Sequence, residues 1–191
     1  MGTRGIFGVH VGGVDKLIYN HFDSYPSGLG NDIVNQYKKL LETKTPNEIK
    51  HLAEVLGPIN PDKKPTKKQK NLLQKYCNTS VSNQDDDDWY CLMRDLQGDV
   101  AEVLTLGLYL PNNDFILDSL FCEWAYILNF DTNKLEVYKG FQREPHQAGR
   151  YCKEAKQDKY YPCALIAEYD LDQLPEDLDK ILSEGVLSEE E

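Results

Sequence analysis

The sequence predicts an α+β fold, because two β-hairpin patterns are separated by several helix patterns. In the first hairpin, residues 4–11 and 14–21 are rich in β-branched and aromatic residues and flank Gly12-Gly13, which accept the positive φ of a two-residue turn. In the second, two alternating apolar runs over residues 123–130 and 135–141 flank a polar four-residue turn. Hairpins separated by helices imply an antiparallel sheet with helices packed on it.

Three helix patterns follow the first hairpin. Asn31 or Asp32 can cap the first helix, whose apolar residues recur every three or four positions until it ends near Thr43. Residues 45–48 begin the second helix, with proline at the first helical position and glutamate three residues after the threonine. Thr66 begins the third helix, which is rich in lysine and carries its apolar residues on one side.

The segment 78–88 is polar and low in complexity, so we expect it to form a mobile surface loop. Its four consecutive aspartates lack the residue order of a calcium-binding loop, which favours a solvated acidic loop over a metal site. Another helical stretch covers residues 89–96 and continues after Gly98 over residues 100–106.

A fifth strand over residues 161–169 and a helix over residues 175–187 complete the pattern. No segment repeats, and the length suits a single domain. We therefore expect one α+β domain over residues 1–187, followed by an acidic tail over residues 188–191. The two hairpins are expected to meet in one sheet, which would bring the loop after the first hairpin close to the start of the second.

Composition and charge narrow the class of function. A formal net charge of −11 argues against DNA or RNA as the partner, because phosphate binding depends on cationic side chains. No apolar run approaches the roughly 20 residues of a membrane-spanning helix, and no signal-peptide pattern opens the chain, so we expect a soluble cytoplasmic protein. The five cysteines have no zinc-ligand spacing, so we expect neither a metal nor another cofactor.

Charge is also unevenly distributed along the chain. Residues 38–75 carry ten lysines and four acidic residues, whereas residues 168–191 carry ten acidic residues and a single lysine, Lys180. This asymmetry is typical of two solvated faces, and it could also serve docking between segments or between molecules.

The segment 19–30, which reads Tyr-Asn-His-Phe-Asp-Ser-Tyr-Pro-Ser-Gly-Leu-Gly, is the main candidate site. It follows a strand pattern, precedes a helix pattern and holds an imidazole, a carboxylate, an amide and several hydroxyls. If the strand continues, alternation places Tyr19, His21 and Asp23 on one face. An imidazole–carboxylate pair there would make His21 a general base that Asp23 orients.

The neighbouring side chains allow more than one interpretation. Asn20, Ser24 and Tyr25 could bind a ligand, and either hydroxyl could be reactive, although no nucleophile elbow or oxyanion loop accompanies them. Asn20, Asp23 and Ser24 are also typical of turns, in which such side chains bond to the backbone. Turn chemistry does not account for His21.

Two further places could hold a ligand. Arg4 stands beside Gly5, where a guanidinium can grip a carboxylate or phosphate in a bidentate manner; it could equally pair with Glu123 or Asp23 of the protein itself. Glu123 and Trp124 could orient a ligand, or Trp124 could cover the core, since tryptophan is usually buried. The candidate catalytic residues are thus His21 and Asp23, and the candidate ligand-binding residues are Arg4, Asn20, Ser24, Tyr25, Glu123 and Trp124.

The opening residues 1–5, Met-Gly-Thr-Arg-Gly, together with segment 19–30, resemble a family of proteins from phages, bacteria, some fungi and large viruses. This resemblance covers about the first thirty residues, with a weaker echo over residues 123–141, and it implies no particular activity.

A second resemblance is more distant. Residues 5–9, Gly-Ile-Phe-Gly-Val, and residues 22–24 with Gly28 resemble the class II glutamine amidotransferases, which belong to the N-terminal nucleophile hydrolases. It implies an αββα layout, but Arg4 occupies the place of the nucleophilic cysteine, which puts amidohydrolase activity in doubt. Gly2-Thr3 is also similar to the junction at which proteasome subunits are processed, and there Thr3 would become a nucleophile only after removal of the residues before it.

Three hypotheses follow. The first is the binding of a small polar or anionic ligand, such as a nucleotide-type signal, at the loop 19–30. The second is a hydrolase or transferase in which His21 and Asp23 act as base and orienter, with water, Ser24 or a processed Thr3 as the nucleophile. The third is a protein–protein interaction module that uses the acidic C-terminal segment.

Overall fold

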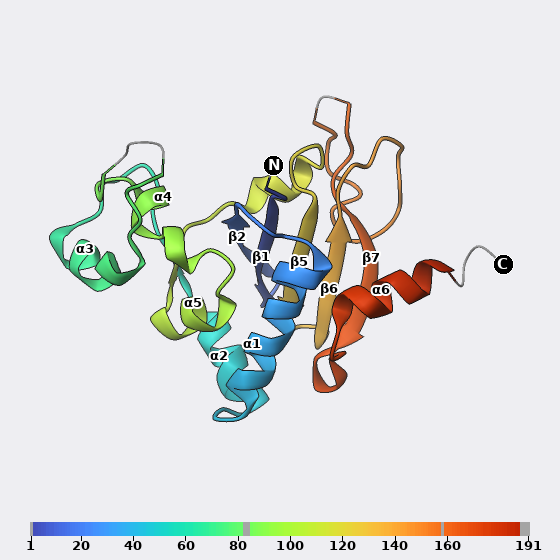
Figure 1. The fold of residues 1–191 in the computed structure, drawn as a ribbon, viewed down its shortest axis with the longest axis horizontal. Coiled ribbons are helices and arrows are strands. Elements are labelled where there is room, and N and C mark those ends of the chain that lie inside the picture. The colour runs from blue at the N-terminus through green and yellow to red at the C-terminus, as the bar shows by residue number, and fades with distance from the viewer. Residues whose placement is uncertain (1, 82–84, 158, 188–191) are drawn as a thin grey trace.

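A five-stranded sheet forms the centre of the computed structural model, which describes residues 2–81, 85–157 and 159–187 (Figure 1). Its strands are β1 (Gly5–Val11), β2 (Val14–Asn20), β5 (Trp124–Asn129), β6 (Lys134–Lys139) and β7 (Ala164–Asp170). In space they lie in the order β2-β1-β5-β6-β7. The two predicted hairpins are β1–β2 and β5–β6, and both are confirmed.

The two hairpins meet through β1 and β5, which run parallel and place Gly5 opposite Trp124. The other neighbouring strands of this sheet run antiparallel. The α+β class is therefore confirmed, but the sheet is mixed rather than wholly antiparallel. A parallel pair needs a long crossover connection, and the helical region between the hairpins provides it.

The helices are α1 (Asn31–Leu41), α2 (Pro46–Val55), α3 (Lys67–Leu73), α4 (Trp89–Leu92), α5 (Val100–Leu106) and α6 (Leu178–Leu187). In Figure 1, α3 and α4 form a lobe on one side of the sheet, and α6 lies on the other side. A second, two-stranded sheet pairs β3 (Gly57–Pro58) with β4 (Leu108–Tyr109) in parallel. The sequence does not predict this sheet, because two-residue strands have no periodic signal.

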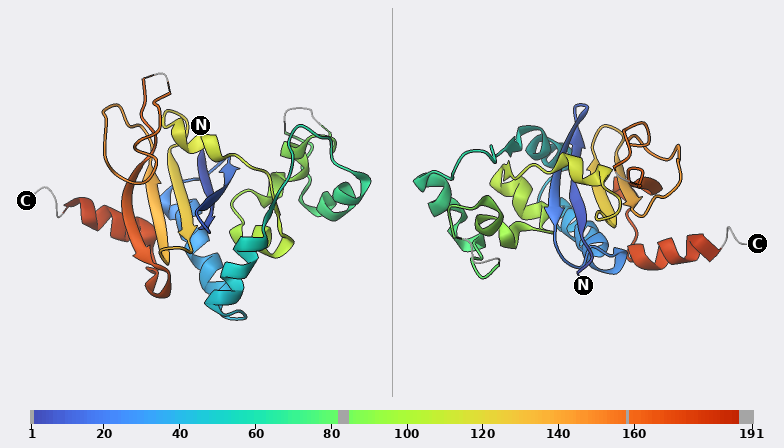
Figure 2. Two further views of the ribbon diagram at one scale, coloured as in Figure 1. Left: turned by 180° about the vertical axis from the view of Figure 1, so that it is seen from behind. Right: turned by 90° about the horizontal axis from the view of Figure 1, so that it is seen from above.

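Helices cover one face of the large sheet (Figure 2). Phe7 and Val9 of β1 and Tyr126 of β5 belong to the same buried cluster as Ile33 and Val34 of α1. Burial of such side chains is the main source of stability, at about 25 cal/mol for each Å² of apolar surface removed from water.

The opposite face is covered mainly by the segments that precede β5 and β7. Ile6 of β1 and Ile127 of β5 pack there with Ile116, Tyr151 and Cys163. Because both faces are covered near the centre of the sheet, β1 and β5 are apolar along nearly their whole length rather than alternating.

Two predicted helix starts are confirmed. Thr45 and Thr66 each form a capping box with the residue three positions later, at the starts of α2 and α3. Helix α1 differs, because it continues directly from a short helical turn over Pro26–Gly30 and no side chain caps it. Asn31, one of its expected caps, instead accepts the backbone N–H of Leu178 over 2.8 Å and so ties α6 to α1.

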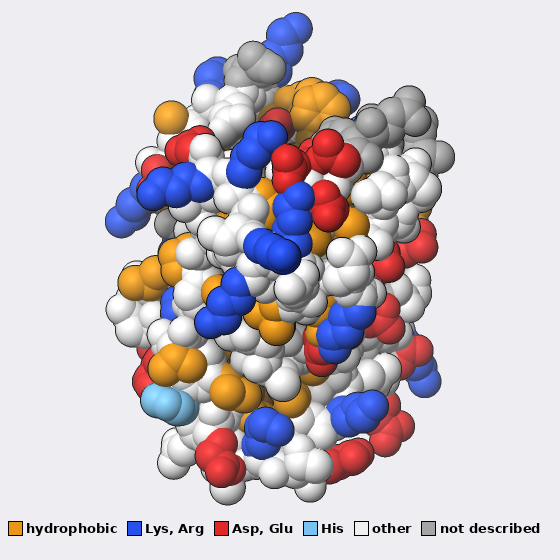
Figure 3. All heavy atoms as spheres, turned by 90° about the vertical axis from the view of Figure 1, so that its left-hand side faces the viewer, with side chains coloured by type: hydrophobic (Ala, Val, Ile, Leu, Met, Phe, Trp, Pro, Cys, Tyr) orange, Lys and Arg blue, Asp and Glu red, His pale blue; other side chains and the backbone are white. Residues whose placement is uncertain are grey.

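Asp86 and Asp87, near the end of the segment 78–88, pair with lysines in and before α3. Lys70 Nζ lies 2.8 Å from Asp86 and also pairs with Asp87, and Lys64 Nζ lies 3.0 Å from Asp87. Figure 3 shows this side of the molecule, where Lys and Arg side chains are scattered with acidic side chains among them. Residues 82–84 of the segment lie outside the described residues, as does the tail over residues 188–191.

The described residues form one large sheet, so the αββα layout with two large sheets is not confirmed. None of their helices combines the length and the apolar character that crossing a membrane requires. Nor does this part of the chain bring together three or more His, Cys, Asp or Glu side chains in an arrangement that could hold a metal ion.

Candidate functional site

Asn20 and Ser24 hold the loop after β2 in shape. Both are buried, and Asn20 Nδ2 donates to Ser24 Oγ over 2.9 Å and to the carbonyl of Phe22. The backbone N–H of Ser24 donates to the carbonyl of Thr3 over 3.2 Å, and its carbonyl accepts the hydroxyl of Tyr126 over 3.1 Å. These bonds attach the loop to the N-terminal segment and to β5.

Asp23 and Tyr25 close the turn through their backbones. Asp23 has a φ of 52°, and its carbonyl accepts the N–H of Leu29 over 2.9 Å. The carbonyl of Tyr25 accepts the N–H groups of Gly28 and Gly30. A Cβ on Gly28 would lie 2.4 Å from the Asp23 carbonyl oxygen, so this close approach requires glycine. Both the Asp23 and Tyr25 side chains are exposed.

The structure does not bring His21 and Asp23 together as base and orienter. Strand β2 ends at Asn20, so the alternation that would put them on one face stops there. His21 Nδ1 instead lies 2.7 Å from the Tyr19 hydroxyl, and no hydrogen bond or ion pair joins it to Asp23 in the described part of the chain.

His21 lies in a positively charged environment. Burial lowers the pKa of its imidazole, and the nearby charges of Arg94 and Arg4 lower that pKa further. The ring is therefore predominantly neutral at pH 7, and its nitrogen can accept a hydrogen bond or a proton.

Arg94 is the most unusual residue near the loop. It is only 9% exposed, yet it forms no ion pair with an acidic side chain among the described residues. Its guanidinium donates to Gln97 Oε1 and lies 5.0 Å from the ring centre of Phe22 and 5.3 Å from that of Tyr90. Gln97 Oε1 also accepts the backbone N–H of His21 over 3.1 Å. Arg94 is thus held in place by an amide and two aromatic rings and forms no ion pair with the described acidic residues.

A polar pocket of about 650 Å³ opens beside Arg94. Its walls come from the loop 19–30, the start of α1, residues 78–81 and the residues between α4 and α5. They are formed by Asn20, Phe22, Asp23, Leu29, Asp32, Asn78, Val81, Arg94, Asp95, Gln97, Gly98 and Asp99. The size lies within the range of small-molecule sites. This pocket therefore contains two of the sequence-predicted site residues, Asn20 and Asp23.

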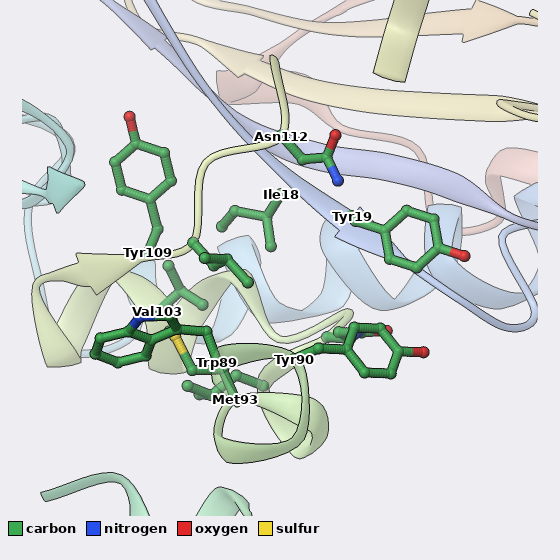
Figure 4. Close-up of a pocket in the computed structure, with 11 residues that line it drawn as sticks. Ile18, Tyr19, Trp89, Tyr90, Met93, Val103, Tyr109 and Asn112 are labelled. Carbon is green, nitrogen blue, oxygen red and sulfur yellow. The ribbon is translucent and has the colours of Figure 1, made fainter. Parts of the chain in front are cut away.

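A second, apolar pocket lies between the sheet and α4 (Figure 4). Tyr19 and Tyr90 lie side by side at one end with their hydroxyls pointing away from Trp89 and Met93. Its volume is about 60 Å³, well below the roughly 150 Å³ of an engineered cavity that accepts benzene. We regard it as a packing gap that could admit only a very small group, and Gln97 lines both pockets.

Arg4, Glu123 and Trp124 lie outside the lining of the polar pocket. The exposed guanidinium of Arg4 lies 5.4 Å from the ring centre of Phe121, and the Arg4 carbonyl accepts the N–H of Glu123 over 3.0 Å. Trp124 is half-buried on β5, a central strand, where it stacks on Tyr126. The predicted site residues therefore divide between the pocket, the turn and the end of the sheet.

A separate polar network lies on the face of the sheet opposite the helices. Arg150 binds both Asp15, over 2.7 Å, and Glu136, while Tyr151 donates to Asp15 over 2.7 Å. His10 Nδ1 lies 2.7 Å from the same Asp15 carboxylate. Burial would raise the pKa of Asp15, but the hydrogen bond and charge of Arg150 outweigh it and hold that pKa below its ordinary value. This network fastens the segment before β7 onto β2 and β6.

Sequence reasoning missed Arg94 and Gln97. Both fall in a stretch that has only a helical pattern, and no local motif marks them. The sequence offers one weak signal: Arg94 and Gln97 follow two adjacent aromatic residues, Trp89 and Tyr90. This signal gains meaning only once the fold is known. A search of protein-family models, of curated proteins and of solved structures finds no match to this chain.

Proposed function

We propose that the protein binds a small polar ligand in the pocket between the loop 19–30 and residues 94–99. One observation carries this proposal: Arg94 is only 9% exposed, lines an open pocket and forms no ion pair with a carboxylate among the described residues. A buried charge without a partner is costly. An acidic or strongly accepting group on a ligand would offset that cost with charge-assisted hydrogen bonds.

The pocket's shape and chemistry support the same proposal. Gln97 fixes the guanidinium, and the rings of Phe22 and Tyr90 hold its plane, so little side-chain entropy is lost when a ligand binds. The Asn20 side chain is held by Ser24 at the pocket wall. A preformed anchor of this kind is typical of ligand sites.

The charges around the pocket narrow the choice of ligand. Four aspartates, Asp23, Asp32, Asp95 and Asp99, line it together with the single arginine. Their repulsion disfavours a polyphosphate, so among nucleotide-type signals the pocket favours those with few charges.

Catalysis by His21 is the second candidate function. The lowered pKa of its imidazole and its contact with the Tyr19 hydroxyl favour a neutral ring that could act as a base on water. Asp23 does not orient it in this structure. Thr3 is buried within the N-terminal segment, which disfavours its use as a terminal nucleophile without rearrangement. His21 is not among the residues that line the polar pocket, and only its backbone N–H reaches the pocket residue Gln97, which makes catalysis the weaker candidate. If His21 acts as a base, replacement by Gln should abolish turnover and leave ligand binding at Arg94 unchanged.

Calorimetric titration of a panel of nucleotides, amino acids and sugar acids against three proteins tests the binding proposal. The proteins are the wild type, Arg94→Met and, as a matched control, Arg143→Met at an exposed arginine. We expect a ligand whose affinity falls about 10- to 100-fold in Arg94→Met, the loss expected for a hydrogen bond to a charged group, and is unchanged in Arg143→Met. Equal affinity for wild type and Arg94→Met, with circular dichroism showing both folded, would overturn the proposal.

A further inference from the structure

The acidic residues that line the pocket are more exposed to solvent than Arg94 is. Arg94 is buried, whereas Asp23, Asp32 and Asp95 are exposed and Asp99 is half-buried. A ligand group that reaches Arg94 therefore passes or faces a rim of carboxylates. A purely anionic ligand is attracted by Arg94 but repelled by the carboxylates of this rim.

Asp32 and Asp99 lie on neighbouring parts of the pocket wall. Gln36, one turn after Asp32 on α1, donates to the Gly98 carbonyl over 2.9 Å and accepts the N–H of Ala101 over 3.3 Å, on either side of Asp99. Asp32 is in the first turn of α1, and Asp99 precedes α5. Burial raises the pKa of Asp32, and the charge of Asp99 raises it further. Asp99 also accepts the backbone N–H of Glu102 over 2.9 Å, which fixes its carboxylate at the start of α5. A cation placed between Asp32 and Asp99 would relieve this repulsion.

We infer that the ligand is a zwitterion, whose acidic group binds Arg94 and whose amine binds between Asp32 and Asp99. This inference rests on the proposed function, because it assigns the ligand class of the same pocket. The buried guanidinium is the observation that makes the acidic rim more than a solvated surface. Arg94, which has no ion pair among the described residues, shares this pocket with Asp32 and Asp99, and the two signs of charge match a molecule that carries both.

Two simpler ligands fit less well. A divalent cation would be repelled by Arg94. Although four aspartates line the pocket, the described residues do not bring three metal-binding side chains close enough together to hold an ion. A simple carboxylate or phosphate would leave the Asp32–Asp99 repulsion in place. The zwitterion is the class that satisfies both charged parts of the pocket.

The test uses linear amino acids from glycine to aminooctanoate, because the series varies the separation between the two charged groups. Each is compared by calorimetric titration with the carboxylic acid and the amine of the same chain length. We expect at least one amino acid to bind about tenfold or more tightly than either single-charge analogue.

Isosteric variants test which carboxylates of the pocket bind the amine of the ligand. Asp32→Asn and Asp99→Asn should each weaken amino-acid binding about tenfold and leave the weak binding of the carboxylic acid unchanged or improved; asparagine retains the cap at α5. Asp114→Asn, at an exposed residue outside the pocket lining, serves as the control. Two results would overturn the zwitterion: a carboxylic acid that binds as tightly as its amino acid, or no binding by any member of the series. In the first case, Arg94-dependent binding of the carboxylic acid would still support the proposed function. In the second case, the titrations with nucleotides, amino acids and sugar acids decide whether the proposed function holds.

Discussion

The hydroxyl of Tyr19 lies 2.7 Å from Nδ1 of His21, two residues along the chain at the end of β2. This contact takes the place of the His21–Asp23 pair that strand alternation predicts. Because Arg94 and Arg4 add positive charge beside the ring, its surroundings resemble an anion-binding site more than a charge relay. The first prediction concerns this imidazole.

The pKa of His21, measured by NMR titration of its ring protons, should lie below the ordinary value of 6.5. Burial and the charge of Arg94 both disfavour the imidazolium, so Arg94→Met should move the pKa upward, whereas Arg143→Met should leave it unchanged. An unshifted pKa in the wild type would contradict the buried, positively charged environment.

The same shift has a consequence for stability. An imidazole whose pKa is lower in the folded state than in the unfolded state binds fewer protons when folded, so the free energy of unfolding rises with pH. The contribution of His21 is complete above the unfolded value near 6.5 and is lost as pH falls through it toward the folded pKa. The difference between wild type and His21→Gln in urea unfolding should therefore change across this window.

Arg150 should contribute more to stability than an exposed arginine does. Arg150→Met leaves Asp15 and Glu136 without their cation in a largely buried network, which typically costs about 3 kcal/mol. Arg143→Met is the control, and we expect a change within about 0.5 kcal/mol. Urea unfolding at neutral pH measures both, and equal values for the two variants would show that the network contributes little.

The pH dependence of Asp15 has the same direction but a different window. Its pKa is lowered in the folded state, so its stabilising contribution is present above the unfolded value of 3.8 and is lost as pH falls from there toward the folded pKa. Acid unfolding of wild type and Asp15→Asn should therefore differ least below this window.

The fold is largely readable from the sequence because its signals are local. Gly12-Gly13 marks the first turn, and the capping boxes at Thr45 and Thr66 mark two helix starts. The parallel pairing of β1 with β5 is not local, since it joins Gly5 to Trp124 across the helical region. No periodicity within either hairpin specifies the direction in which the two hairpins meet.

The site is less readable from the sequence, because the features that distinguish it depend on contacts between distant parts of the chain. The loop 19–30 stands out by composition, and it does form a wall of the polar pocket. Arg94, however, becomes distinctive only through its burial and its lack of a carboxylate partner among the described residues, and both depend on the fold. Residues such as Ser24 and Tyr25 were candidates by chemical type, but their contacts show them building the turn.

A further prediction concerns Gly5, which lets the N-terminal segment approach the loop. A Cβ at this position would lie 2.5 Å from the carbonyl oxygen of Trp124 and 2.7 Å from Cβ of Ser24. Gly5→Ala should therefore destabilise the protein by about 1–3 kcal/mol, as other overpacking substitutions do. Gly57→Ala is the matched control, because its nearest neighbour would be the Gly107 carbonyl oxygen at 3.6 Å. Similar melting temperatures for the two variants would show that the close contact at Gly5 relaxes easily.

The deletion that would test the acidic C-terminal segment must spare α6. Leu178 is fully buried, and its N–H binds Asn31, so a chain cut after Leu174 loses part of the core as well as the acidic residues. We expect that cut to lower the melting temperature, whereas a cut after residue 187 keeps the described fold. A partner whose binding is lost in the shorter deletion, with the melting temperature unchanged, would support the interaction hypothesis; unchanged binding would remove it.

The last prediction separates the two roles that the sequence allows for Asp23. Its φ of 52° is left-handed, which aspartate, asparagine and glycine tolerate better than alanine. If Asp23 shapes the turn, Asp23→Asn and Asp23→Gly should change the free energy of unfolding little, and Asp23→Ala should reduce it by about 1–2 kcal/mol. None of the three should change the pKa of His21, because the imidazole contacts Tyr19 rather than this carboxylate. A fall in the His21 pKa in Asp23→Asn, measured by the same NMR titration, would instead show that the two residues couple as the sequence pattern predicts, since loss of a nearby carboxylate disfavours the imidazolium.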